Sequence, residues 1–116
     1  MEKELVQLEQ AVHAFTYMET DGPGQLLQIT QQLKHVVQEY YVNEGDVEVL
    51  KDTALQLEDA EMYLKTLRPD NLNINDWKHN IQSFSKAKGL ILYSLNLLQA
   101  ALRFGRLPVQ AAEVSF

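Results

Sequence analysis

The sequence predicts an all-α domain, an antiparallel four-helix bundle with a long C-terminal helix and a short tail. Apolar residues recur every three or four positions in four stretches, as they do on the buried face of a helix. Breaks rich in Gly, Pro, Asn and Asp separate the stretches, and no segment alternates apolar and polar residues as a strand does. Short breaks imply antiparallel neighbouring helices. We therefore expect one helical domain over residues 1–106 and a tail over residues 107–116.

The first helix is expected over residues 2–20. Glutamates near its start suit the positive end of the helix dipole. Its apolar stripe consists of Leu5, Leu8, Val12 and Phe15. The run Asp-Gly-Pro-Gly at residues 21–24 is a strong turn signal and should end this helix.

The second helix is expected from Pro23 or Gly24 to Val42. Proline is accepted in the first turn because its missing N–H would have no partner there. The apolar stripe comprises Leu26, Ile29, Leu33, Val36 and Tyr40, widened by Leu27, Val37 and Tyr41. Residues 43–45, Asn-Glu-Gly, then break the pattern.

Asp46 predicts the start of the third helix, because its carboxylate can accept a free backbone amide of the first turn. The helix should run to Leu67, and Pro69 should stop it. Its stripe comprises Val47, Leu50, Ala54, Leu57, Ala60, Leu64 and Leu67. In the loop that follows, Leu72 and Ile74 are expected to pack inward.

Residues 75–106 predict a long fourth helix, capped by Asn75 or Asp76, with apolar residues on two opposite faces. The stripe expected to face the core comprises Trp77, Ile81, Phe84, Ile91, Leu95, Leu98 and Leu102. The second face comprises Leu90, Tyr93, Leu97, Ala100 and Phe104. A helix that is apolar on two faces has to be covered twice. Another helix, the chain's own tail or a partner must therefore cover the second face.

Two residues interrupt the core stripe of this helix. Lys88 stands where one more apolar residue would fall. Its ammonium group can reach the surface along the methylene chain, the alternative that we favour, or it can fix the register of the helices. Gly89 can kink the helix. Unbroken, the helix would be about 45 Å long against about 30 Å for the others, so it should either overhang them or break.

Composition excludes several classes of protein. The chain has no cysteine, which excludes disulfides, thiolate zinc sites and cysteine nucleophiles. The longest uncharged run, residues 89–102, is shorter than the roughly 20 residues that a membrane helix needs. The acidic start is not that of a signal peptide. We expect no membrane contact and a cytoplasmic location.

The net charge of −6 conceals an asymmetry along the chain. Residues 1–62 carry thirteen acidic side chains and three lysines, whereas residues 63–116 carry seven basic and three acidic side chains. An acidic surface disfavours direct binding to nucleic acid, because that binding depends on Lys and Arg at the phosphates. We expect no nucleic-acid partner.

Three histidines are the only candidates for metal ligation or acid–base chemistry: His13, His35 and His79. They fall on three different expected helices, and each has a carboxylate three or four residues away. No Glu-x-x-His pair occurs, although di-metal sites in helical bundles depend on that pair. We therefore expect no metal and no cofactor.

No motif for catalysis or phosphate binding is present either. The serines lie outside any Gly-x-Ser-x-Gly turn, and no glycine-rich phosphate loop occurs. The acidic cluster of Glu44, Asp46, Glu48 and Asp52 lacks the ligand spacing of a calcium-binding loop. We expect no enzymatic activity.

The favoured functional hypothesis is a non-enzymatic interaction module: a small adaptor, inhibitor or chaperone-like protein. Its expected interface is Leu90, Tyr93, Leu97 and Phe104, covered by a second copy of the last helix in a twofold homodimer. A tail over residues 109–116 that folds back in a monomer is the alternative cover. The rival functions are a metal-binding or enzymatic bundle that uses the histidines, and an acidic mimic of nucleic acid. The mimic would use Glu58, Asp59 and Glu61 together with Glu44, Asp46 and Glu48.

Overall fold

The computed structural model describes residues 2–17, 21–42, 47–68 and 73–105 of the chain. These residues form four helices and no strand, which confirms the all-α prediction. The helices are α1 (Glu2–Ala14), α2 (Gly22–Val42), α3 (Val47–Lys65) and α4 (Ile74–Arg103). Within the described residues, no helix is long and apolar enough to cross a membrane.

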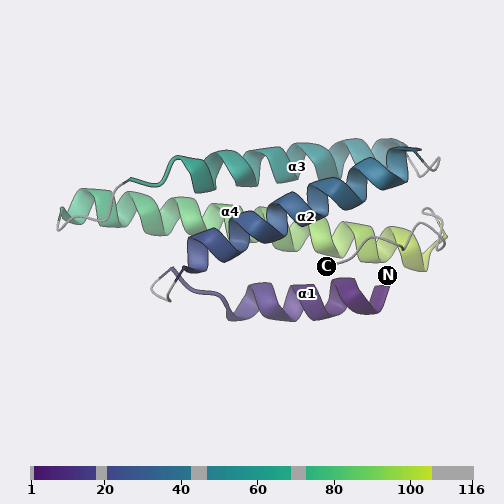
Figure 1. The fold of residues 1–116 in the computed structure, drawn as a ribbon, viewed down its shortest axis with the longest axis horizontal. Helices are drawn as coiled ribbons and strands as arrows, with labels where there is room; N and C mark the ends of the chain where they lie inside the picture. The colour runs from purple at the N-terminus through teal and green to yellow at the C-terminus, as the bar shows by residue number, and fades with distance from the viewer. Residues whose placement is uncertain (1, 18–20, 43–46, 69–72, 106–116) are drawn as a thin grey trace.

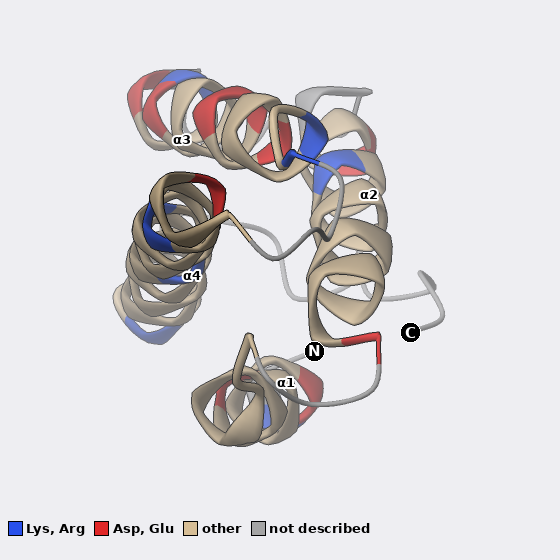
Figure 2. Ribbon diagram, turned by 90° about the vertical axis from the view of Figure 1, so that its left-hand side faces the viewer, with Lys and Arg blue, Asp and Glu red and all other residues tan. Residues whose placement is uncertain are grey.

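Successive helices run in opposite directions along the long axis of the molecule (Figure 1). α4 lies between α1 and α3, and its most extensive contact is with α3. α2 packs mainly on α3. Seen from the end, the four helices surround one core (Figure 2).

The core consists mainly of leucine and valine from the stripes that the sequence predicts. Leu5 and Val12 of α1, Leu33 of α2 and Leu57 of α3 are completely buried. Ile91, Leu95 and Leu98 of α4 are equally inaccessible to solvent. Leu8, Phe15 and Ala54 are half-buried at the edge of this core. Helical periodicity therefore placed the buried faces of α1, α2 and α3 correctly.

The predicted end of the first helix is wrong, because α1 stops at Ala14 rather than near Thr20. Lys88 of α4 donates hydrogen bonds from Nζ to the carbonyl oxygens of His13 (2.9 Å) and Phe15 (2.8 Å). The last carbonyls of a helix have no partner within the helix, and a cation stabilises that end. The lysine that interrupts the apolar stripe of α4 thus holds the end of α1.

α4 is continuous through Gly89, where a side-chain carbon would meet no other atom within 4 Å. Its N-cap is Asn73 rather than the expected Asn75 or Asp76, because the Asn73 side chain accepts a hydrogen bond from the Asn75 amide at 2.8 Å. Gly105 adopts a φ of 71°, a conformation that favours glycine, immediately after the helix.

The buried face of α4 is centred differently from the predicted stripe. Trp77 was expected in the core but is 43% exposed, and Ile74, expected to pack inward, is 62% exposed. Several small or polar residues are buried instead: Asn80, Ser83, Ala87, Ser94 and Ala101. The predicted stripe is nevertheless largely buried, at Phe84, Ile91, Leu95, Leu98 and Leu102. The spacing of large apolar residues does not show which small and polar residues are buried beside it.

Asn80 is the polar centre of one end of the core and is only 2% exposed. Its Oδ1 accepts a hydrogen bond from the Arg68 amide at 2.8 Å. Its Nδ2 donates to the Arg68 carbonyl and to the Tyr17 hydroxyl, both at 3.0 Å. Tyr17 also packs edge-on against Phe84, with ring centroids 6.0 Å apart. One side chain therefore joins α4 to the residues that follow α1 and α3.

Replacing Tyr40 by phenylalanine should stabilise the protein by about 1 kcal/mol. Tyr40 is 1% exposed, and its hydroxyl has no hydrogen-bond partner among the described residues. Burial also raises the pKa of this phenol. Urea unfolding of Tyr40→Phe beside the native protein measures the difference. A loss of stability would show that the hydroxyl is hydrogen-bonded in solution.

Candidate functional site

The four residues of the expected interface occupy different environments in the structure. Phe104 is 78% exposed and Tyr93 is 49% exposed. Leu90 and Leu97 are half-buried and pack against the core. The homodimer interface itself stays a prediction, but only its two aromatic members present much surface to a partner.

α3 covers the middle of this face of α4. The Tyr93 hydroxyl donates a hydrogen bond to Oδ2 of Asp52 at 3.1 Å. This hydrogen bond, together with the negative charge of Asp52, raises the pKa of Tyr93. Part of the second apolar face of α4 therefore packs against α3, and the rest is exposed to solvent.

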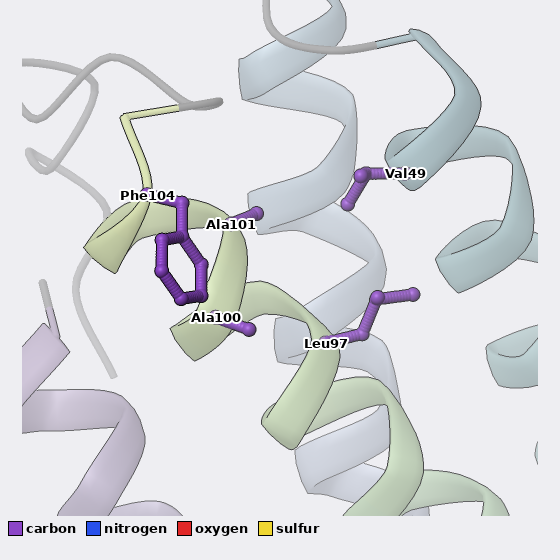
Figure 3. Close-up of a pocket in the computed structure, with 5 residues that line it drawn as sticks. All are labelled: Val49, Leu97, Ala100, Ala101 and Phe104. Carbon is purple, nitrogen blue, oxygen red and sulfur yellow. The ribbon is translucent and has the colours of Figure 1, made fainter.

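A groove lies between α3 and α4 near the C-terminal end of α4, and we call it the Phe104 groove. It has a volume of about 420 Å³ and is lined by Val49, Leu97, Ala100, Ala101 and Phe104. Figure 3 shows the Phe104 ring beside Ala100, with Val49 on the other wall. All five of these described lining residues are apolar, so the groove offers space for an apolar side chain.

Sequence reasoning found Leu97, Ala100 and Phe104 but missed two lining residues of the groove. Val49 precedes the expected stripe residue Leu50, and Ala101 lies beside the expected face residue Ala100. The feature of the sequence that could have indicated this groove is the pair of small residues, Ala100 and Ala101, between large apolar residues. Small residues there leave room that the neighbouring helix does not fill.

A second hollow, of about 300 Å³, is polar and lies between α2 and α3. Glu61 lines it and forms ion pairs with Lys34 at 2.8 Å and with Lys65 at 2.7 Å. Lys34, and then Lys65, lower the pKa of Glu61 from 4.5 to about 2. The positive charges of this hollow are thus already paired with a carboxylate.

Acid should weaken the fold through Glu61. A carboxyl group with a lower pKa in the folded than in the unfolded protein stabilises the fold above its unfolded pKa. That contribution is lost as the pH falls from about 4.5 to about 2. Urea unfolding over this range should show a steeper loss for the native protein than for Glu61→Gln. Equal losses would contradict this role for Glu61.

The three histidines contact three separate sets of atoms. His13 lies 3.8 Å from Glu9, and His35 lies 3.7 Å from Glu39, each on its own helix. His79 lies 3.2 Å from the Thr66 carbonyl oxygen. Within the described residues, no three histidine or carboxylate side chains are grouped to hold a metal ion. The absence of bound metal stays a prediction, which elemental analysis of the purified protein checks.

The acidic surface expected on α3 is partly neutralised. Glu61 is paired with two lysines, while Glu58 and Asp59 are exposed. Glu44 and Asp46 lie outside the described residues. Figure 2 shows acidic residues along α3 and basic residues along α4. The arrangement is one of opposite charges on neighbouring helices.

Comparison of the chain with protein-family models, with curated proteins and with solved structures finds no match.

Proposed function

We propose that this chain is a non-enzymatic interaction module, an antiparallel four-helix bundle that binds protein through the Phe104 groove. The observation that carries the proposal is the exposed Phe104 ring on the rim of a groove whose described lining residues are all apolar. An aromatic side chain that is 78% exposed next to such a groove forgoes the free energy of burial. A partner that covers both would recover it.

The proposed occupant is a second copy of the chain. In a twofold dimer, Phe104 of each copy would enter the groove of the other, and such self-complementary contacts are the commonest in oligomers.

Light scattering on Phe104→Asp tests the dimer. The native protein should have twice the mass of one chain, and the variant should be a folded monomer. Leu55→Asp is the matched control, because Leu55 is 60% exposed on α3 but does not line the groove. It should remain dimeric.

A native protein that is monomeric at high concentration would refute the dimer. The fold-back alternative involves residues 109–116, which lie outside the described residues. In that case Leu97→Asp would lower the melting temperature without changing the mass.

A further inference from the structure

An apolar stripe of α4 is left uncovered at the end of the molecule opposite the Phe104 groove. It consists of Ile74, Trp77 and Ile81, spaced by three and four residues on one side of the helix, and we call it the Trp77 stripe. Ile74 is 62% exposed, Trp77 is 43% exposed and Ile81 is half-buried. Tryptophan is the residue type most enriched among those that dominate binding energy at interfaces.

The stripe is uncovered because α1 is short. Lys88 holds the C-terminal carbonyls of α1, so α1 ends beside that position of α4. From Lys88 back to Ile74, α4 extends about 20 Å further. Figure 1 shows this end of α4 projecting beyond the ends of α1 and α2. A second helix placed end to end with α1 would therefore cover the stripe.

The charge beside the stripe indicates what kind of helix fits. Two charged groups near this end of α4 already have partners: the Asp76 carboxylate is paired with Arg68 at 2.9 Å, and Lys88 binds the carbonyls at the end of α1. Lys78, next to Trp77, is exposed and has no partner among the residues that the structure describes. An acidic group on an approaching helix would pair with it.

We propose that the Trp77 stripe binds an acidic amphipathic helix of a partner protein, laid along α4 beyond the end of α1. The apolar face of that helix covers Ile74, Trp77 and Ile81, and its carboxylates face Lys78. This is helix-on-helix recognition, in which apolar residues at helical spacing provide the anchors. The site is distinct from the Phe104 groove and does not depend on dimer formation.

Trp77 reports on the site directly, because it is the only tryptophan of the chain. The probe is a displayed library of amphipathic helical peptides of about five turns. Leucine occupies their apolar positions, and Glu, Gln or Lys is drawn at random for each polar position. Selection on the full chain should enrich glutamate over lysine. The selected peptides, once synthesised, should shift Trp77 emission to shorter wavelength in a saturable way. A selected pool without excess glutamate, or binding that leaves Trp77 emission unchanged, would overturn the proposal.

Three variants sharpen the test with the selected peptides. Ile74→Ser should weaken binding about tenfold or more, because one large apolar contact is lost. Leu55→Ser, at an equally exposed position of α3, should bind as the native protein does. Lys78→Glu should weaken binding about fivefold, the effect of one exposed ion pair. Equal affinities for Ile74→Ser and Leu55→Ser would place the peptide elsewhere.

A measurement on the protein without peptide tests whether a second copy of the chain occupies the stripe. If Trp77 emission shifts with protein concentration in the absence of peptide, and Ile74→Ser abolishes that shift, the occupant is a second copy and the partner proposal is wrong. Phe104→Asp separates this site from the groove. The variant should lose the proposed dimer but bind the selected peptides unchanged.

Discussion

Asn80→Ala should destabilise the protein by about 3 kcal/mol, because it removes three hydrogen bonds made by a buried side chain. The substitution removes the hydrogen bonds of Asn80 to the amide and carbonyl of Arg68 and to the Tyr17 hydroxyl. Each of these hydrogen bonds contributes about 0.5–1.5 kcal/mol to stability. For a chain of this size, the melting temperature should fall by roughly 10 °C. Calorimetry or thermal circular dichroism measures the change.

Asn96→Ala is the matched control on the same helix. Asn96 is exposed, so its replacement should change stability by less than about 0.5 kcal/mol. If the two variants melted at the same temperature, Asn80 would not join the helices in solution. Proton exchange of the Arg68 amide, faster in Asn80→Ala, would locate the lost contact.

Lys88→Met distinguishes two predictions of how Lys88 affects the stability of the protein. The apolar spacing of α4 predicts a gain in stability, since methionine would complete the stripe. The structure predicts a loss of about 1–3 kcal/mol, because the ammonium group donates hydrogen bonds to two carbonyl oxygens at the end of α1. Amide exchange in α1 should accelerate more than in α3, since α1 is the helix that Lys88 holds.

Lys78→Met is the control for Lys88→Met. It removes a lysine from the same helix at an exposed position, without any contact to α1 among the described residues. Its stability should stay within about 0.5 kcal/mol of the native value. A gain in stability for Lys88→Met would mean that completing the apolar stripe outweighs the lost hydrogen bonds. It would also show that the carbonyl groups at the end of α1 find other hydrogen-bond partners.

The candidate site was only partly predictable. The sequence identified Leu97 and Phe104 as surface that needs a cover, because their spacing places them on one side of a helix. It could not show that α3 reaches Tyr93 through Asp52, a residue 41 positions earlier. It also placed Trp77 in the core, because Trp77 continues the apolar spacing of α4, whereas α1 ends six residues before the predicted end and Trp77 is 43% exposed. The Trp77 stripe is exposed because α1 is short, whereas the Phe104 groove is open because Ala100 and Ala101 are small.

Local apolar spacing is sufficient to place the four helices and most of the large buried residues on each of them. Those features depend on residues three or four positions apart, so they are present in any short window of the chain. The end of α1 and the identity of the buried polar residues of α4 depend instead on how the helices pack. Lys88 and His13 are 75 positions apart, and Asn80 and Tyr17 are 63 positions apart. Contacts over such separations form only when the helices pack, so the three- and four-residue spacing of the sequence cannot predict them.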